Sequence, residues 1–249
     1  MKKLKTEIWF ERPTPGNAFS PMKSFLRGRN FYSDLVMNCS YPEMIFFTLS
    51  GRKPSRRDLK RLNLFLNACS NPGIRDEASR TAMNAAIGRG PLGSAVIAGL
   101  LTRTGRNRGS EWIEEVMQNM QKAFETKGDL KNFQNFSGLG LHFGSADSRA
   151  IDLLKIIEEK GYRGKFQDLL IDSSNEENPI LLEGLIAAGF LDLGFSPEQG
   201  ALLFLISPAA SLFAFAEEQN RMGYKEYPNF FEKGAFTYHP LENSTGEAK

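Results

Sequence analysis

Helix start signals recur along this chain, and apolar residues at helical spacing follow each of them. The segment Ser40–Glu43 has the pattern of a capping box, in which a serine and a glutamate side chain satisfy each other's free backbone amides. The segment Ser196–Gln199 repeats this pattern before a second apolar run. Only Thr6–Glu11 fits a short strand, and no run shows the period-2 alternation of a substantial sheet. The sequence therefore predicts an all-α helical bundle.

The periodic part of the chain divides into a series of helices between two ends that lack periodicity. We expect helices near residues 41–50, 56–69, 76–87, 92–101, 112–124, 149–159, 166–171 and 179–188, followed by an apolar pair between 197 and 219. The two ends contain proline, glycine and asparagine without a helical pattern, which is typical of extended arms. We predict an N-terminal arm at 1–30, a helical domain with a small lobe at 31–223, and a C-terminal arm at 224–249.

Two of these segments are apolar on nearly every face. Leu92–Leu101 is apolar all round, which predicts a central helix. Ala201–Ala216 is interrupted by Ser207-Pro208 and is shorter than the ~20 residues that a membrane span needs, so we expect two buried helices with a break. The charged N-terminal segment lacks the apolar stretch of a secretory signal. These features predict a cytoplasmic protein without a membrane span.

The charge balance argues against a general nucleic-acid-binding surface. Lysine and arginine number 31 against 29 aspartates and glutamates, which leaves a net charge of +2. The basic residues between Arg52 and Arg61 are expected on a solvated helix face or loop, outside the apolar stripe of their helix. Cys39 and Cys69 lie in apolar helical patterns, which indicates buried thiols. Two histidines and two separated cysteines offer no metal-ligand spacing.

The order of several short motifs is more distinctive than any one of them. In chain order they are Arg27–Phe31, Ser40–Ser55, Leu64–Ala68, Ala98–Leu101, Gly138 with Gly140, Leu182–Leu185, and Ala210–Gln219. In this order and spacing the chain resembles the citrate synthase and citryl-CoA lyase family from near residue 25 to near residue 225. The resemblance implies a helical bundle built as a symmetric dimer or an assembly of dimers. The chain length is nearer that of the short citryl-CoA lyases than that of a full citrate synthase.

The same resemblance implies chemistry at the α-carbon of an acyl-CoA thioester. That chemistry needs a carboxylate base, groups that polarise the carbonyl oxygens, and arginines that hold substrate carboxylates. Glu183 stands at the family's base position, Asn71 stands where the family has a histidine, and His142 lies one residue from the position of another. Each residue also has a structural interpretation. Glu183 could be an exposed residue on an outer helix face, Asn71 a turn residue, and His142 a hydrogen-bonded structural histidine.

Arginines supply the predicted anion contacts. Arg106 and Arg108 lie between two glycines, where guanidinium groups can hold phosphates or carboxylates bidentately; a basic loop without function is the alternative. Arg149 ends a segment similar to the family's Asp-Pro-Arg, and Arg27 is a further candidate for an anion contact. The family's carboxylate-binding arginine near the last helix is missing, because Ser207-Pro208 stands there.

Three functions remain open at this point. The chain is an enzyme that makes or breaks a carbon–carbon bond in an acyl-CoA with a non-standard substrate, an inactive homologue that binds a ligand or a partner subunit, or a true citryl-CoA lyase. The missing histidines and arginine predict that citrate cleavage or synthesis is very weak. No bound cofactor is expected, and a homodimer or larger homo-oligomer is expected because apolar helices are costly to expose. Convergence of Glu183, His142 and Asn71 on one cleft would favour an enzyme, whereas a solvent-facing Glu183 would favour the inactive homologue.

Overall fold

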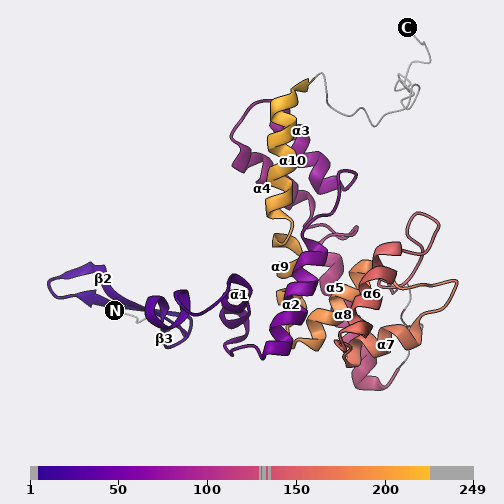
Figure 1. Ribbon diagram of the computed structural model, residues 1–249, viewed down its shortest axis with the longest axis horizontal. Helices are drawn as coiled ribbons and strands as arrows, with labels where there is room; N and C mark the ends of the chain where they lie inside the picture. The colour runs from indigo at the N-terminus through magenta and orange to yellow at the C-terminus, as the bar shows by residue number, and fades with distance from the viewer. Residues whose placement is uncertain (1–4, 129, 131–132, 134–135, 225–249) are drawn as a thin grey trace, which may run out of the picture.

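The computed structural model describes residues 5–128, 130, 133 and 136–224, and within them the chain is mostly α-helical (Figure 1). A small sheet contains β1 (Trp9–Thr14), β2 (Asn17–Leu26) and β3 (Arg29–Asn30), and a π-helical turn, η1 (Phe31–Val36), follows it. The helices are α1 (Tyr41–Ser50), α2 (Arg56–Cys69), α3 (Glu77–Ile87), α4 (Leu92–Thr102), α5 (Ser110–Thr126), α6 (Ser148–Glu159), α7 (Lys165–Ser173), α8 (Leu182–Asp192), α9 (Pro197–Ile206) and α10 (Ala209–Met222). The predicted helical bundle is confirmed.

Local signals place several of the helix starts. The Ser40 side chain accepts a hydrogen bond from the Glu43 amide, and the Glu43 carboxylate accepts one from the Ser40 amide, so the predicted capping box begins α1. Ser55 and Ser196 begin α2 and α9 in the same way. Gly51 ends α1 with a φ of 74°, a left-handed conformation that glycine adopts without steric cost. These boundaries follow from residues that are close in sequence.

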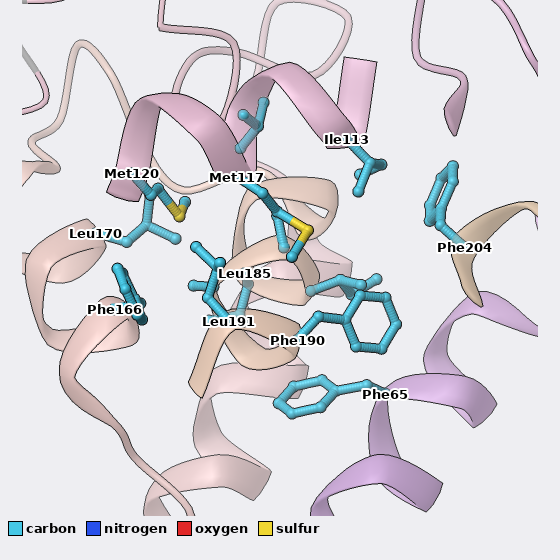
Figure 2. Close-up of a cluster of buried hydrophobic side chains, with 14 of the residues drawn as sticks. Phe65, Ile113, Met117, Met120, Phe166, Leu170, Leu185, Phe190, Leu191 and Phe204 are labelled. Atoms are coloured by element: carbon cyan, nitrogen blue, oxygen red, sulfur yellow. The ribbon is translucent and has the colours of Figure 1, made fainter. Parts of the chain in front are cut away.

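Helix α8 forms the centre of the main body. Every residue from Leu182 to Leu191 is buried, and α2, α5, α6, α7 and α9 all contact this helix. Figure 2 shows part of the core, in which Phe65 of α2 and Met117 of α5 pack around Phe190 of α8. Burial on every side explains why the sequence of α8 has no amphipathic pattern.

Helices α3, α4 and α10 form a three-helix unit that stands apart from the main body, with α9 leading into it (Figure 1). Buried alanines of α3, including Ala78 and Ala82, allow the close packing of α4 and α10. In α4, however, the side chains of Ile97 and Leu101 are 58% and 65% exposed. The prediction that α4 is a central helix is therefore wrong for the single chain, because its neighbours cover only one of its faces.

The apolar run after residue 196 forms two helices, as the sequence predicts. Ser207 and Pro208 separate α9 from α10. The stretch Pro197–Met222 is still long and apolar enough, by length and composition alone, to cross a membrane. Several of its residues nevertheless lie in the protein core, among them Leu203 and Leu212, which are fully buried. Core packing accounts for part of the apolar character of this stretch, and other apolar side chains in it, such as Phe213, are exposed.

The N-terminal arm folds as an antiparallel hairpin, whereas the sequence pattern indicates at most one short strand. β1 begins at Trp9 and pairs with β2, and the two strands project from the rest of the molecule (Figure 1). Most side chains of β1 and β2 are exposed, and only the end of β2, at Ser24 and Leu26, is buried, so too little of either strand has a buried face to impose alternation on the sequence. The predicted C-terminal arm falls mostly on residues 225–249, which lie outside the described residues.

A buried ion pair joins α2 to the end of α8. The Arg61 guanidinium lies 3.6 Å from the Asp192 carboxylate, and the two side chains are only 7% and 2% exposed. The same carboxylate accepts hydrogen bonds from the amides of Phe166 and Gln167 at the start of α7. Burial raises the pKa of Asp192 and lowers the pKa of Arg61, even though each favours the charged form of the other. The prediction that the basic residues 52–61 face solvent is therefore wrong at Arg61.

Candidate functional site

A cleft of about 930 Å³ lies between the end of α2, the start of α3, and α6 and α8. Glu183, His142 and Asn71 all line this cleft. Arg108 and Arg149 line it as well. The chain therefore brings together five predicted site residues that are separated by up to 112 positions in the sequence (183 − 71).

Glu183 lies in the first turn of α8 and is 7% exposed, so it does not stand on an outer helix face. One carboxylate oxygen, Oε1, lies 3.8 Å from Arg108 and 3.5 Å from Arg149. The other oxygen, Oε2, is buried and has no hydrogen-bond partner among the described residues. Two guanidinium groups thus orient this carboxylate while one of its oxygens keeps its full capacity to accept a proton.

Asp147 holds the two sides of this arrangement together. Its carboxylate accepts hydrogen bonds from the Arg149 amide, in the first turn of α6, and from the Leu182 amide, which begins α8. It also forms two hydrogen bonds with the Arg149 guanidinium, at 2.9 and 2.8 Å. Burial alone would raise the pKa of Asp147, but the hydrogen bonds from Arg149 and Leu182 outweigh it and hold this pKa below its ordinary value. Asp147 is therefore ionised at neutral pH and fixes Arg149 beside Glu183.

Two glycine motifs of the sequence meet at the start of α8. A Cβ atom at Gly184 would lie 2.2 Å from the Gly138 carbonyl oxygen, so only glycine fits at this contact without a shift of the backbone. Leu139 forms a β-bridge with Ile180, which makes the chain before α8 extended. For this reason α8 begins at Leu182 and not near residue 179, where the sequence predicts its start. The contact places the loop that carries His142 next to Glu183.

His142 lies in the turn before α6 with its Nδ1 atom facing two arginines. Arg108 is 2.5 Å and Arg149 is 3.4 Å from that nitrogen. Because guanidinium groups only donate hydrogen bonds, Nδ1 must accept, and the proton of the neutral ring lies on Nε2. Burial, together with the charges of Arg149 and Arg108, lowers the pKa of His142 below its ordinary value. His142 is therefore a neutral ring whose Nε2–H group can donate a hydrogen bond.

Asn71 is both a turn residue and a cleft residue, the two interpretations that the sequence leaves open. Its side-chain oxygen accepts a hydrogen bond from the Gly73 amide at 2.9 Å, which makes it a turn residue. It also lines the cleft. With its oxygen in the turn, the amide NH₂ group is the part of the side chain that can donate to a ligand.

Arg106 and Arg108 are two residues apart and have different surroundings. Arg106 is 81% exposed, pairs with Glu111 and does not line the cleft. Arg108 has a φ of 59° and does line it. Gly109 makes this turn possible, because a Cβ there would come within 2.3 Å of a backbone oxygen. We therefore include Arg108 in the site and omit Arg106.

Arg27 also lies outside the cleft. Its Nε atom donates a hydrogen bond to the Thr48 carbonyl oxygen at 2.9 Å, and its guanidinium packs beside Gly51. These contacts tie the turn after β2 to the end of α1. Arg27 therefore has a structural explanation in the single chain, and we omit it from the site.

Two cleft residues, Arg103 and Asp76, were not predicted as part of the site. The Arg103 guanidinium lies 3.5 Å from the Asp76 carboxylate and 4.0 Å above the Phe204 ring centroid. Burial lowers the pKa of Arg103 and raises the pKa of Asp76. Asp76 is recognisable from the sequence only as an acidic residue at the start of a predicted helix, where it does cap α3.

The cleft contains one thiol, that of Cys69, which is 3% exposed. Burial raises its pKa to about 12, so the group remains a neutral thiol and is not a nucleophile at neutral pH. Among the described residues, no group of three or more histidine, cysteine, aspartate or glutamate side chains is arranged to hold a metal ion. The chemical groups available in this cleft are therefore a carboxylate, an imidazole, an amide and several guanidinium groups.

Comparison with known proteins bears on the fold. No protein-family model matches the chain, and no curated protein sequence matches it. Among solved structures, citryl-CoA lyase from Hydrogenobacter thermophilus is similar with a TM-score of 0.75 and 22% identity, over 98% of both chains. ATP citrate lyase from Methanothrix soehngenii, in complex with citrate and coenzyme A, has a TM-score of 0.77 and 14% identity over 99% of this chain and 43% of its own.

A third similar structure is citrate synthase from a thermophilic archaeon, Thermoplasma acidophilum, with a TM-score of 0.59 and 14% identity over 82% of this chain and 58% of its own. At these identities the likeness defines the fold, and function has to be argued from the site. The chain therefore has the citrate synthase-like fold, which it shares with citryl-CoA lyase over nearly its whole length.

Proposed function

We propose that this protein binds an acyl-CoA thioester together with a carboxylate substrate and makes or breaks the carbon–carbon bond at the thioester α-carbon. The observation that carries the proposal is the convergence of Glu183, His142 and Asn71 with two arginines in one cleft. The fold supports it, because similar structures include a citryl-CoA lyase and an ATP citrate lyase in complex with citrate and coenzyme A. The position of this carboxylate in the cleft, beside two arginines and a histidine, favours an enzyme over an inactive homologue.

Each group has a distinct role in this reaction. Glu183 removes the proton from the α-carbon, and in the reverse direction it returns the proton to the carbon. The Nε2–H group of His142 and the amide of Asn71 donate hydrogen bonds to the oxygens on which negative charge develops. Arg108 and Arg149 bind the substrate carboxylate.

Cleavage of citryl-CoA itself is the second candidate. It is favoured by the similarity to citryl-CoA lyase, which extends over 98% of both chains. Against it, Asn71 and the loop around Arg108 lack the histidines that the family resemblance leads one to expect, and Ser207 and Pro208 occupy the position of a carboxylate-binding arginine. We therefore favour a related substrate over citryl-CoA.

The proposal predicts exchange of the α-protons of acetyl-CoA with solvent. The protein is incubated with acetyl-CoA in D₂O, with and without a panel of 2-oxo acids, and deuterium at the acetyl methyl group is measured by mass spectrometry. Exchange above the rate without protein is expected, because the base acts before the bond forms. The absence of exchange with every acid, together with no thermal stabilisation by any CoA thioester, would contradict the proposal.

We also propose that the protein is a cytoplasmic dimer or larger homo-oligomer. The exposed apolar side chains of Ile97 and Leu101 on α4 and of Phe213 on α10 belong to helices of the same three-helix unit, and a second copy would cover them. Sedimentation should give a mass of at least twice 27.9 kDa at micromolar concentration. Replacing Ile97 and Leu101 by glutamate should shift the protein toward monomer, whereas Ile151→Glu on α6 should not. A folded wild-type monomer would contradict this prediction.

A further inference from the structure

Among the described residues, the charged groups next to Glu183 are balanced: two arginines face two carboxylates. Arg149 lies 2.8 Å from Asp147 and 3.5 Å from Glu183, and Arg108 lies 3.8 Å from Glu183. Two guanidinium groups thus face two carboxylates. His142 adds no charge near neutral pH, because burial and the two arginines lower its pKa. Arg108 is the more weakly paired of the two guanidinium groups, because its 3.8 Å contact with Glu183 is the longest in this group, so the site has at most one cation available to a ligand.

Elsewhere in the cleft the positive charge is also compensated. Arg103 is 7% exposed and is paired with Asp76. The remaining arginine among the described lining residues is Arg75, which is exposed. It is followed in sequence by two acidic residues, Asp76 and Glu77, and both of them also line the cleft. An exposed guanidinium suits the phosphates of coenzyme A, which remain near solvent, and leaves the interior of the cleft without an unpaired cation.

Apolar side chains form much of the remaining lining. They are Leu153, Ile156, Leu182, Ile186 and Phe204. Burial of a carboxylate against such a surface is costly unless a cation or hydrogen-bond donors compensate it, whereas burial of an alkyl group is favourable. Arg108, whose side chain is 32% exposed, is the guanidinium best placed to bind one carboxylate.

We infer that the carboxylate substrate is a 2-oxo acid with a single carboxylate and an apolar side chain, and not a dicarboxylate such as oxaloacetate. This inference rests on the proposed function and names its substrate class. A single carboxylate pairs with Arg108, with Arg149 beside it, the oxo group meets His142 and Asn71, and the alkyl chain contacts the apolar lining. A second carboxylate would lack a counter-charge among the described residues of the cleft.

The reaction balances without an oxidant or a reductant. The α-carbon of the thioester loses a proton to Glu183 and forms a bond to the carbonyl carbon of the 2-oxo acid. The electron pair of the carbonyl π bond moves to oxygen, which takes up a proton. The product is a 3-carboxy-3-hydroxyacyl-CoA thioester with an alkyl substituent, and the cleavage direction reverses each step.

The test compares four 2-oxo acids by calorimetry with the full-length protein. They are 2-oxobutyrate, 4-methyl-2-oxopentanoate, oxaloacetate and 2-oxoglutarate, each with and without coenzyme A. The two monocarboxylates should bind at least about tenfold more tightly than the two dicarboxylates, because the second carboxylate must give up its hydration without a partner. Equal or tighter binding of either dicarboxylate would overturn the inference.

This test separates the inference from the proposed function. Binding of the free acids needs no turnover, so the order of affinities can be read even if acetyl-CoA exchanges no deuterium. Exchange that oxaloacetate stimulates best would retain the proposed function and overturn the inference. A preference for monocarboxylates without any exchange would support the charge argument and count against the proposed chemistry.

A charge variant provides a second measurement. Asp152 lines the cleft, and its side chain is 76% exposed, so Asp152→Lys adds positive charge at the rim without disturbing the core. We expect the affinity ratio of oxaloacetate to 2-oxobutyrate to rise about fivefold at low salt. Glu159→Lys makes the same change in charge on the same helix, at an exposed position that does not line the cleft, and should leave the ratio unchanged. Equal ratios in both variants would show that local charge does not set the preference.

Discussion

Replacement of Glu183 by glutamine should reduce the rate of deuterium exchange into acetyl-CoA by about 10²- to 10⁴-fold. Glutamine keeps the shape of the side chain but cannot accept the proton. The free energy of unfolding should fall only modestly: Oε1 loses its charge attraction to Arg108 and Arg149, which are 32% and 40% exposed, and Oε2 has no hydrogen-bond partner among the described residues to lose. Binding of a carboxylate substrate should not weaken, since Arg108 and Arg149 lose a competing negative charge.

The matched control is Glu159→Gln, which makes the same chemical change at an exposed position of α6. His142→Asn should cost less than Glu183→Gln, because Asn71 can share the polarisation of the oxygen. Near wild-type exchange by Glu183→Gln would place the base elsewhere in the cleft. Loss of exchange together with loss of folding, as judged by circular dichroism, would leave Glu183 with a structural role only.

The largest expected loss of stability follows from replacement of Asp192 by alanine. Arg61, with a side chain only 7% exposed, would keep its charge in the core without a counter-charge. Removal of one partner from a buried ion pair typically costs about 3–5 kcal/mol. The amides of Phe166 and Gln167 would also lose their acceptor at the start of α7. Urea denaturation should show the loss as a lower midpoint.

Asp168→Ala is the control for this measurement. Asp168 pairs with Arg163 at 2.8 Å, and both side chains are more than 40% exposed. A surface pair of this kind contributes only about 0–1 kcal/mol. If Asp192→Ala were no more destabilising than Asp168→Ala, the buried pair would not stabilise the junction of α2, α7 and α8.

The features that the sequence predicted well are local. Ser40 and Glu43 are three residues apart, and such a pair forms its hydrogen bonds in nearly any tertiary context. The burial of Arg61 was not predictable in this way, because it depends on Asp192, which is 131 positions away (192 − 61). The hairpin was not predictable for a different reason: apart from Ser24 and Leu26 at the end of β2, its strands have almost no buried positions, so their sequences carry no sustained alternation.

The candidate site was predictable in its residues but not in its geometry. Glu183, His142 and Asn71 were named through a family resemblance, and nothing in their local sequence shows that they share a cleft. Arg106 and Arg108 have the same residue type and the same flanking glycines, and the sequence does not show that Arg108, with its left-handed φ, is the one that lines the cleft. Asp147, which organises the site, is the first residue of the segment that Arg149 ends, and the sequence alone does not show its role.

Asp147 links the beginnings of α6 and α8 through a single buried carboxylate. A fluctuation that removes this carboxylate would release the Leu182 amide and the Arg149 guanidinium at the same moment. We therefore expect the start of α8, which carries the base, and the start of α6, which carries the arginine, to open together in local unfolding. Hydrogen exchange of the Leu182 and Arg149 amides should then show similar protection.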